Sequence, residues 1–200
     1  LRAPTGVEAD TPLDYLCPCN TPDVLTDATA DLAFGLILAT MRRIPEGERF
    51  LRDGRWRAFR PDLLLGHEVT GSTLGVVGFG RTSQAVTRRA AGFRMRVLYA
   101  SPREVDFPGA TRVPLEALLA ESDVVSLHCP LDASTRDLID ARALARMRRT
   151  AVLINTSRGG VVDEAALAEA LLAGVIAGAG LDVFAREPAV HARLLDAPNA

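Results

Sequence analysis

Two segments near the end of the chain place a charged residue just beyond an apolar run. Arg158 follows the run at 151–154, and Glu187 follows the run at 176–181. An arginine binds carboxylates through a planar, permanently charged fork, and a glutamate can raise the pKa of an imidazole that donates protons. Ligands of open parallel sheets sit outside the carboxyl ends of the strands. The pattern predicts an acid-binding and proton-transfer site there. The alternatives are a loop arginine that binds backbone carbonyls and a surface glutamate.

A glycine-rich turn follows an earlier apolar run at 74–77, and an amphipathic stretch to about residue 91 comes after it. Gly78 suits a tight turn, and Gly80 lets the backbone approach a pyrophosphate held by the start of the next helix. Ser83 stands where a third glycine is usual, and we expect it to add only a small steric load. The turn predicts a dinucleotide site, with a turn that binds nothing as the alternative. The candidate contacts are Gly78, Phe79, Gly80, Arg81, Thr82 and Ser83.

The residue expected to contact the adenosine ribose is not acidic. An Asp or Glu about twenty positions after the glycine turn usually binds the ribose 2′-OH of NAD. Here Ser101 follows the run at 97–100, and Arg103 comes two residues later. A serine with an arginine suits a 2′-phosphate better, which makes NADP at least as suitable as NAD. The alternative for Arg103 is a solvated loop residue.

Apolar runs alternate with helical segments through the rest of the chain. We expect Asp140 to cap a helix to about residue 147, and Asp163 to cap a helix that Gly174 ends. Alternation of this kind predicts βαβ units, and therefore an α/β fold with a doubly wound parallel sheet of the Rossmann type. The runs are apolar throughout, as strands covered on both faces should be. The expected strands are 74–77, 97–100, 124–127, 151–154 and 176–181.

The part of the chain before the sheet divides into an irregular segment, a helix and a polar stretch. Thr26 can cap a helix that runs to about Arg43. A polar, arginine-rich stretch to about residue 71 has Trp56 as its one large anchor. The face expected to be apolar on the helix consists of Leu32, Leu36 and Ala39. The expected units are an irregular remnant at 1–20, an interdomain-type helix at 21–45 and a dinucleotide-binding domain at 46–200.

Composition excludes several classes of protein. Lys and Arg total 23 against 25 for Asp and Glu, so the net charge of −2 gives no reason to expect nucleic acid or an anionic membrane as a partner. Apolar runs fall short of the roughly 18 residues that a membrane span needs. Cys17, Cys19 and Cys129 are too few for a disulfide framework and indicate a reducing, cytoplasmic setting. Cys17 and Cys19 lack a second ligand pair, so we expect ordinary thiols and no metal.

From about residue 20 to 199 the chain resembles the D-isomer-specific 2-hydroxyacid dehydrogenases. The resemblance includes Asn20-Thr21-Pro22, the stretch 25–31, the glycine turn, the run 122–131 and the two charged segments. Residues 115–119 and 178–184 bring it closest to the glyoxylate/hydroxypyruvate reductase branch. The resemblance implies reduction of a small 2-oxo acid, such as glyoxylate or hydroxypyruvate, to the D-2-hydroxy acid by hydride transfer from NADPH or NADH.

The resemblance also implies a role for individual residues. Arg158 would grip the substrate carboxylate, Glu187 would hydrogen-bond the catalytic histidine, and Asp182 would contact the nicotinamide amide. His128 would orient a loop against the cofactor rather than act as the catalytic histidine. The other implied cofactor contacts are Cys129, Pro130, Thr135, Thr156 and Ser157.

The chain departs from the family pattern at both ends. The family's catalytic histidine comes a few residues after a Pro-Asn pair, whereas Pro198-Asn199 is followed here only by Ala200. His67 and His191 do not match that position, and residues 1–20 are too few for the family's first half-domain. The resemblance therefore implies a fragment that binds a dinucleotide without turning over substrate, and a homodimer for the full-length protein. The alternative is a non-catalytic dinucleotide sensor like the corepressors that share the fold.

Overall fold

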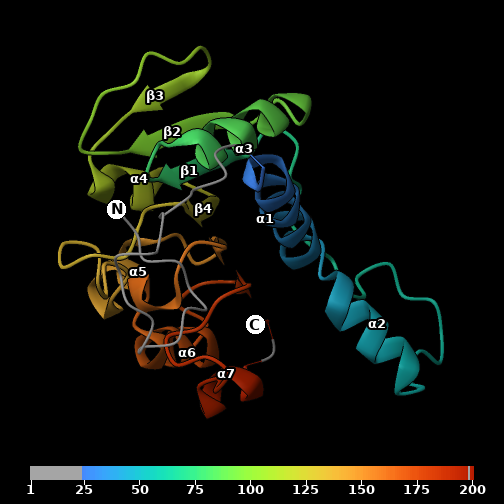
Figure 1. Cartoon of the computed structure of the whole chain (residues 1–200). Helices are drawn as coiled ribbons and strands as arrows, with labels where there is room; N and C mark the ends of the chain where they lie inside the picture. Colours follow the sequence, from blue (N-terminus) through green and yellow to red (C-terminus); the bar gives the residue numbers. More distant parts are fainter. Residues whose placement is uncertain (1–23, 198) are drawn as a thin grey trace.

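Six parallel strands form one sheet in the computed structural model, which describes residues 24–197 and 199–200. The strands are β1 (Thr73–Val77), β2 (Arg96–Ala100), β3 (Ala110–Arg112), β4 (Val124–Leu127), β5 (Val152–Asn155) and β6 (Gly178–Leu181). Their spatial order is β3-β2-β1-β4-β5-β6, and every neighbouring pair is parallel (Figure 1). The order reverses between β1 and β4, which confirms the predicted doubly wound α/β fold.

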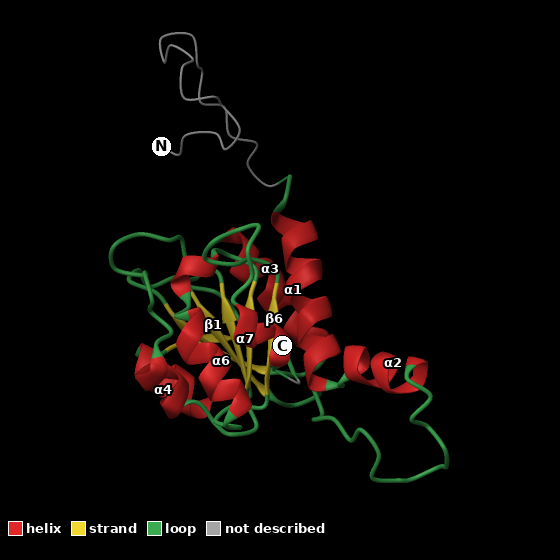
Figure 2. Ribbon diagram, turned by 90° about the horizontal axis from the view of Figure 1, so that it is seen from below, coloured by secondary structure: helices red, strands yellow, loops and turns green. Residues whose placement is uncertain are grey.

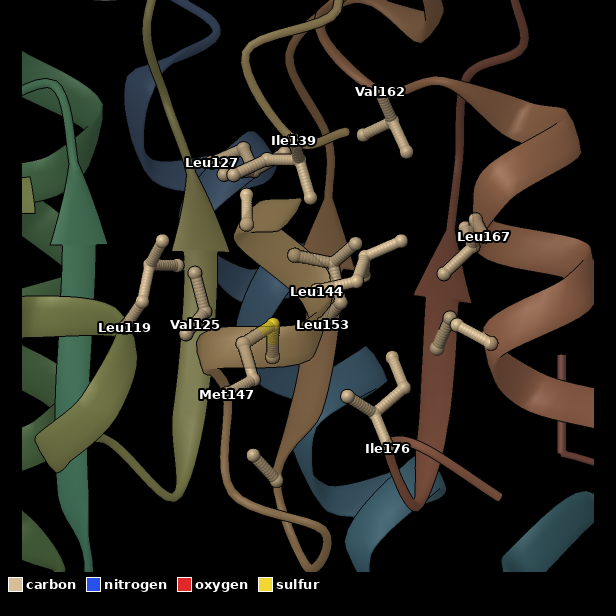
Figure 3. Close-up of a cluster of buried hydrophobic side chains, with 14 of the residues drawn as sticks. Leu119, Val125, Leu127, Ile139, Leu144, Met147, Leu153, Val162, Leu167 and Ile176 are labelled. Atoms are coloured by element: carbon tan, nitrogen blue, oxygen red, sulfur yellow. The ribbon is translucent and has the colours of Figure 1, made fainter. Parts of the chain in front are cut away.

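Helices cover both faces of this sheet. One face carries α1 (Thr26–Met41) and α3 (Arg81–Gly92), which pack on each other. The other face carries α4 (Leu115–Glu121), α5 (Ala141–Arg146), α6 (Glu164–Leu172) and α7 (Ala192–Asp196). Because side chains alternate along a strand, Leu153 faces the second layer while Val152 and Ile154 face the first. Figure 3 shows the second layer, where Leu144, Met147 and Leu167 close over the sheet. Burial on both sides explains why the strands are apolar throughout.

Two predicted helix caps are confirmed. The Asp140 carboxylate accepts a hydrogen bond from the Ala143 amide at 2.8 Å. The Asp163 carboxylate accepts from the amides of Ala165 and Ala166 at 3.0 and 3.1 Å. Both carboxylates satisfy amides that have no acceptor within their helix.

The predictions for the first helix were wrong in two respects. Thr26 is the first helical residue rather than the cap, since Leu25 occupies the cap position without a side-chain bond, and the helix ends at Met41. The predicted apolar face was also misplaced, because Leu32 is 42% exposed. The helix packs against α3 as well as β5 and β6, so the face that these elements cover together differs from the predicted one. Its buried residues are Ala30, Ala33, Phe34, Ile37 and Met41.

The stretch between the first helix and the sheet contains a helix that the sequence did not predict. This helix, α2 (Ile44–Arg52), has Pro45 in its first turn and an ion pair of 2.7 Å between Arg43 and Glu46. Figures 1 and 2 show α2 and the following loop extending away from the sheet. Trp56 is 58% exposed there, so the prediction that it acts as an anchor was wrong within this chain.

Some expectations fall outside the described residues, among them those for residues 1–20, for Cys17 and Cys19 and for the first family motif. Within residues 24–197 and 199–200, no helix combines the length and apolar character needed to cross a membrane. The same part of the chain holds no cluster of three or more His, Cys, Asp or Glu side chains that could bind a metal ion.

Candidate active site

The carboxyl ends of five strands meet at one edge of the sheet. In the strand register, Val77 pairs with Ala100 and with Leu127, and Asn155 pairs with Leu127 and with Leu181. The residue after each of these strands therefore starts a loop at the same edge. These residues are Gly78, Ser101, His128, Thr156 and Asp182, all of which are predicted site residues. The fold thus gathers segments that lie more than a hundred residues apart in the sequence, as Gly78 and Asp182 do.

The glycine turn after β1 packs directly against the end of β4. Gly78 has a φ of 83°, and its amide donates to the Ala100 carbonyl at 2.8 Å. A Cβ atom at this position would lie 2.8 Å from the Cys129 nitrogen and 2.9 Å from the Cys129 Cα. Both the backbone conformation and this close approach require glycine. The turn is consequently held in one position relative to β4.

Ser83 closes the glycine turn. Its hydroxyl donates to the Gly78 carbonyl at 2.8 Å and accepts from the Gly80 amide at 3.0 Å, and the side chain is fully buried. We expected only a small steric load from this serine, whereas its hydroxyl links both ends of the turn. Phe79 is also buried and stacks on Tyr99 at a centroid distance of 4.1 Å, so its side chain anchors the turn in the core.

The turn leaves room where a phosphate group would approach. A Cβ atom at Gly80 would find no atom within 4 Å, so this position faces open space. Gly80 is also the cap residue of α3, and Arg81 and Thr82 form the first helical turn. Amides of a first helical turn have no acceptor within the helix and carry the positive end of its dipole. The arrangement fits an anionic group such as a diphosphate.

A cavity of about 680 Å³ lies between the carboxyl ends of β1, β2 and β4. This volume falls within the range of small-molecule sites. Four of the predicted cofactor contacts line it, namely Gly78, Ser101, Cys129 and Thr135. The Thr135 hydroxyl donates to the Pro130 carbonyl at 2.6 Å and accepts from the Asp132 amide at 2.8 Å, which fixes the loop that closes the cavity.

The charged residues of this cavity differ from those singled out in the sequence. Arg103 is exposed and does not line the cavity. Glu104 and Arg112 do line it. Sequence reasoning missed Arg112 because it lies in β3, a three-residue edge strand whose Thr111 and Arg112 are exposed and which therefore lacks an apolar run.

At the other end of the edge, Asn155 shapes the loop that carries Arg158. Its side-chain amide donates to the Arg158 carbonyl at 3.0 Å. Its side-chain oxygen accepts from the Ser157 amide at 3.0 Å and from the Ser157 hydroxyl at 2.9 Å. Asn155 is 1% exposed, whereas Arg158 is exposed and donates to the neighbouring Ser157 carbonyl at 2.6 Å. Asn155 therefore acts as a positioning residue, and the sequence signal for it is its place directly after the apolar run at 151–154.

The loops of Arg158 and Glu187 are in backbone contact. A Cβ atom at Gly159 would lie 1.9 Å from the Phe184 carbonyl carbon, so the two loops touch without any side chain between them. The Phe184 amide donates to the Glu187 carboxylate at 2.9 Å, and the Ala185 amide donates to Glu164 of α6 at 2.6 Å. The structure therefore brings Arg158 and Glu187 to adjacent loops, each on the exposed side of the edge.

Thr156 follows β5 directly, and its hydroxyl is an unpaired polar atom among the described residues. Its hydroxyl is buried and has no hydrogen-bond partner among the described residues. Buried hydroxyls without a partner are uncommon in folded proteins, since each loses hydration without compensation. A ligand group with hydrogen-bonding capacity at the end of β5 would satisfy it. Asp182, the corresponding residue after β6, is exposed, and its amide donates to the Asn155 carbonyl at 3.0 Å.

His128 is held neutral at the end of β4. Burial lowers the pKa of its imidazole to about 4, and its Nε2 lies 2.9 Å from the Ser126 hydroxyl. A group with such a pKa is a poor proton donor near neutral pH. This low pKa argues against His128 as a proton donor at neutral pH.

The low pKa predicts acid sensitivity. The folded chain binds the proton less readily than the unfolded chain, whose histidine titrates near 6.5. The stability due to neutral His128 is therefore complete above about pH 6.5, and about 3 kcal/mol of it is lost as the pH falls to about 4. Urea unfolding of wild type and His128→Gln at pH 7, 5.5 and 4 measures this loss as a fall in the unfolding free energy of wild type relative to that of the variant. A difference independent of pH would contradict it. The exposed His67→Gln serves as a control and should follow wild type.

Comparison with known proteins agrees with this arrangement. Residues 34–200 match the family described as D-isomer specific 2-hydroxyacid dehydrogenase, NAD binding domain. The chain is 56% identical over 174 residues to a glyoxylate reductase of Korarchaeum cryptofilum, covering 84% of this chain and 52% of that protein. The chain thus spans about half the length of the curated relatives it matches.

Solved structures of similar proteins point to the same family. A protein of Thermus thermophilus superposes with a TM-score of 0.86 at 49% identity, covering 90% of this chain and 58% of that one. An NADPH-dependent glyoxylate/hydroxypyruvate reductase of Sinorhizobium meliloti, solved with citrate, superposes with a TM-score of 0.80 at 42% identity, covering 90% and 57%. With the family match over residues 34–200, the chain belongs to the D-isomer-specific 2-hydroxyacid dehydrogenases.

Proposed function

We propose that this chain forms the dinucleotide-binding part of an NADPH- or NADH-dependent reductase of small 2-oxo acids, such as glyoxylate or hydroxypyruvate. The observation that carries the proposal is the backbone contact between the loops of Arg158 and Glu187 at the edge that also holds the glycine turn. The names of the relatives, several of them glyoxylate reductases, favour a reductase over a non-catalytic sensor.

The cofactor would lie along the carboxyl edge of the sheet. Its diphosphate would sit over Gly80 at the start of α3, where the helix dipole and amides favour an anion. Its adenosine would fill the cavity between β1, β2 and β4. Its nicotinamide would then reach Asp182 and the end of β5, where the Thr156 hydroxyl has no hydrogen-bond partner within residues 24–197 and 199–200. When bound, the nicotinamide supplies the hydride, and the protein orients it.

The substrate would bind against the exposed guanidinium of Arg158. A planar cation holds a carboxylate with two parallel hydrogen bonds and polarises the adjacent carbonyl. Glu187 lies on the neighbouring loop, where its carboxylate can raise the pKa of an imidazole that protonates the carbonyl oxygen. Asn155 and Gly159 act as positioning residues that hold the two loops in register.

Activity of a chimera tests this function. In the chimera, this chain replaces the matched 174-residue part of the Korarchaeum glyoxylate reductase, which it resembles at 56% identity. We expect the chimera to reduce glyoxylate, and Arg158→Gln to lower kcat/KM by about a hundredfold or more, because the carboxylate loses a charged partner. The assay follows NADPH oxidation by absorbance.

The matched control for this experiment is Arg142→Gln, which removes an exposed arginine from α5. It should leave kcat/KM unchanged. A folded chimera that binds NADPH but reduces no 2-oxo acid would overturn the proposed reaction, and an Arg158→Gln chimera as active as its parent would overturn the role of Arg158.

We also propose a homodimer in the cytoplasm. The segment formed by α2 and residues 53–68 extends from the body (Figure 2). It exposes large apolar side chains, which a second copy would cover. These side chains are Ile44, Leu51, Trp56, Phe59 and Leu65. The free, buried thiol of Cys129 fits a reducing compartment. A monomer mass by light scattering at micromolar concentration would contradict the dimer.

A further inference from the structure

Arg112 forms the cationic part of the cavity wall. It lies in β3, the edge strand beside β2, and lines the cavity together with Ser101 and Glu104. In sheets of this type the adenosine ribose binds just beyond the end of β2. A cation placed there faces the 2′ position of that ribose, where NADP carries a phosphate and NAD carries a hydroxyl.

The Arg112 guanidinium is held in place by the loop after β2. Its Nε and Nη2 donate to the Ser101 carbonyl at 3.2 and 3.0 Å. Nη2 also donates to the Pro102 carbonyl at 3.0 Å. These bonds fix one edge of the planar group against the backbone. Because the guanidinium carries five N–H donors in a fixed geometry, donors remain on Nη1 for a ligand.

The ion pair between Arg112 Nη1 and the Glu104 carboxylate is loose. Nη1 lies 3.8 Å from a carboxylate oxygen of Glu104, a distance too long for a hydrogen bond. The Glu104 side chain is 79% exposed, whereas that of Arg112 is 40% exposed and fixed by carbonyls. An exposed ion pair of this kind contributes little, so the carboxylate can turn into solvent at small cost. The cavity thus holds a fixed cation with an exchangeable anion.

We propose that Arg112 binds the 2′-phosphate of NADP and that Glu104 is the counter-ion that the phosphate displaces. This rests on the proposed function, since it assumes that a dinucleotide occupies the edge. The Ser101 hydroxyl, at the end of β2, would be the neutral partner of the same phosphate. Arg103, which the sequence had suggested for this role, is exposed and outside the cavity lining.

Calorimetric titration of the full chain with NADPH and with NADH tests the assignment. We expect Arg112→Gln to weaken NADPH binding about tenfold while NADH changes less than about twofold, since a charged hydrogen bond to the phosphate is lost. Glu104→Gln should strengthen NADPH binding about threefold by removing a competing anion. The matched control, Arg103→Gln, should leave both affinities near wild type. Retained NADH binding shows that each variant is folded.

The possible outcomes separate this assignment from the proposed function. If Arg112→Gln weakens NADH and NADPH equally, Arg112 only supports the loop and the assignment is overturned. If Arg103→Gln alone causes the selective loss, Arg103 is the phosphate cation. If Glu104→Gln selectively weakens NADH, Glu104 binds the ribose hydroxyls instead. A wild-type chain that binds neither dinucleotide overturns the proposed function together with the assignment.

Discussion

Gly159→Ala is expected to destabilise the chain by about 3 kcal/mol or more, at the upper end of the range for overpacking. The added Cβ would lie 1.9 Å from the Phe184 carbonyl carbon and 2.3 Å from the Ala185 nitrogen. Both are backbone atoms. The Phe184 and Ala185 amides donate hydrogen bonds to the carboxylates of Glu187 and Glu164, so this backbone cannot move aside without breaking those hydrogen bonds. Urea unfolding measures the change as a lower midpoint.

Gly160→Ala is the matched control, one residue further along the chain. Its added Cβ would lie 3.0 Å from a terminal methyl group of Leu131, which can rotate away. We expect a loss below about 1.5 kcal/mol, because the contact is with the flexible end of a side chain. Equal losses in the two variants would contradict the backbone contact between the loops of Arg158 and Glu187.

Alanine substitutions in the glycine turn are expected to separate folding from binding. Gly78→Ala should cost about 2–4 kcal/mol, because it combines a φ of 83° with a Cβ 2.8 Å from the Cys129 nitrogen. Gly80→Ala should cost less than about 1 kcal/mol, since its Cβ would enter open space and only the weaker N-cap preference of alanine counts against it. It should still weaken dinucleotide binding about tenfold or more, because the backbone could no longer approach the diphosphate.

Thermal unfolding and calorimetric titration of both variants check this pair. A stability loss in Gly80→Ala as large as that in Gly78→Ala would show that the turn is packed differently. Unchanged affinity in a stable Gly80→Ala variant would mean that no diphosphate lies at the start of α3. Either result stands independently of the cofactor's identity, because both NADH and NADPH carry the diphosphate.

The features that sequence predicted best are those set by local chemistry. The strand β4 was predicted with its observed bounds, because its four residues are buried on both faces and must all be apolar or, in the case of Ser126, small. Asp140 and Asp163 were recognised as caps because a carboxylate before a helix satisfies its first amides. The alternation of such elements was sufficient to predict the sheet.

The features that sequence did not predict depend on contacts between distant segments. β3 is a three-residue edge strand that pairs only with β2, so no apolar run marks it. Leu32 is exposed because α1 is oriented by α3, β5 and β6 together. The role of Ser83 could not be read from its position, since it depends on how the turn folds back on the helix.

The candidate site likewise combines features that the sequence predicted with features that depend on contacts between distant segments. The loops of Arg158 and Glu187 were expected at one edge because both residues follow strands. Their contact through Gly159 and Phe184 emerges only from the packing of the two loops. The cavity cation could not be found at all from the spacing after the glycine turn, because Arg112 arrives from a neighbouring strand rather than from the loop after β2.

The most direct measurement is a crystal structure of the chain with NADPH bound. The expected result has the diphosphate over Gly80 at the start of α3, the adenosine in the cavity with its 2′-phosphate on Arg112, and the nicotinamide beside Thr156. A cavity that stays empty at saturating NADPH, or a cofactor whose diphosphate lies away from this turn, would contradict the proposal that the carboxyl edge of the sheet is a dinucleotide site.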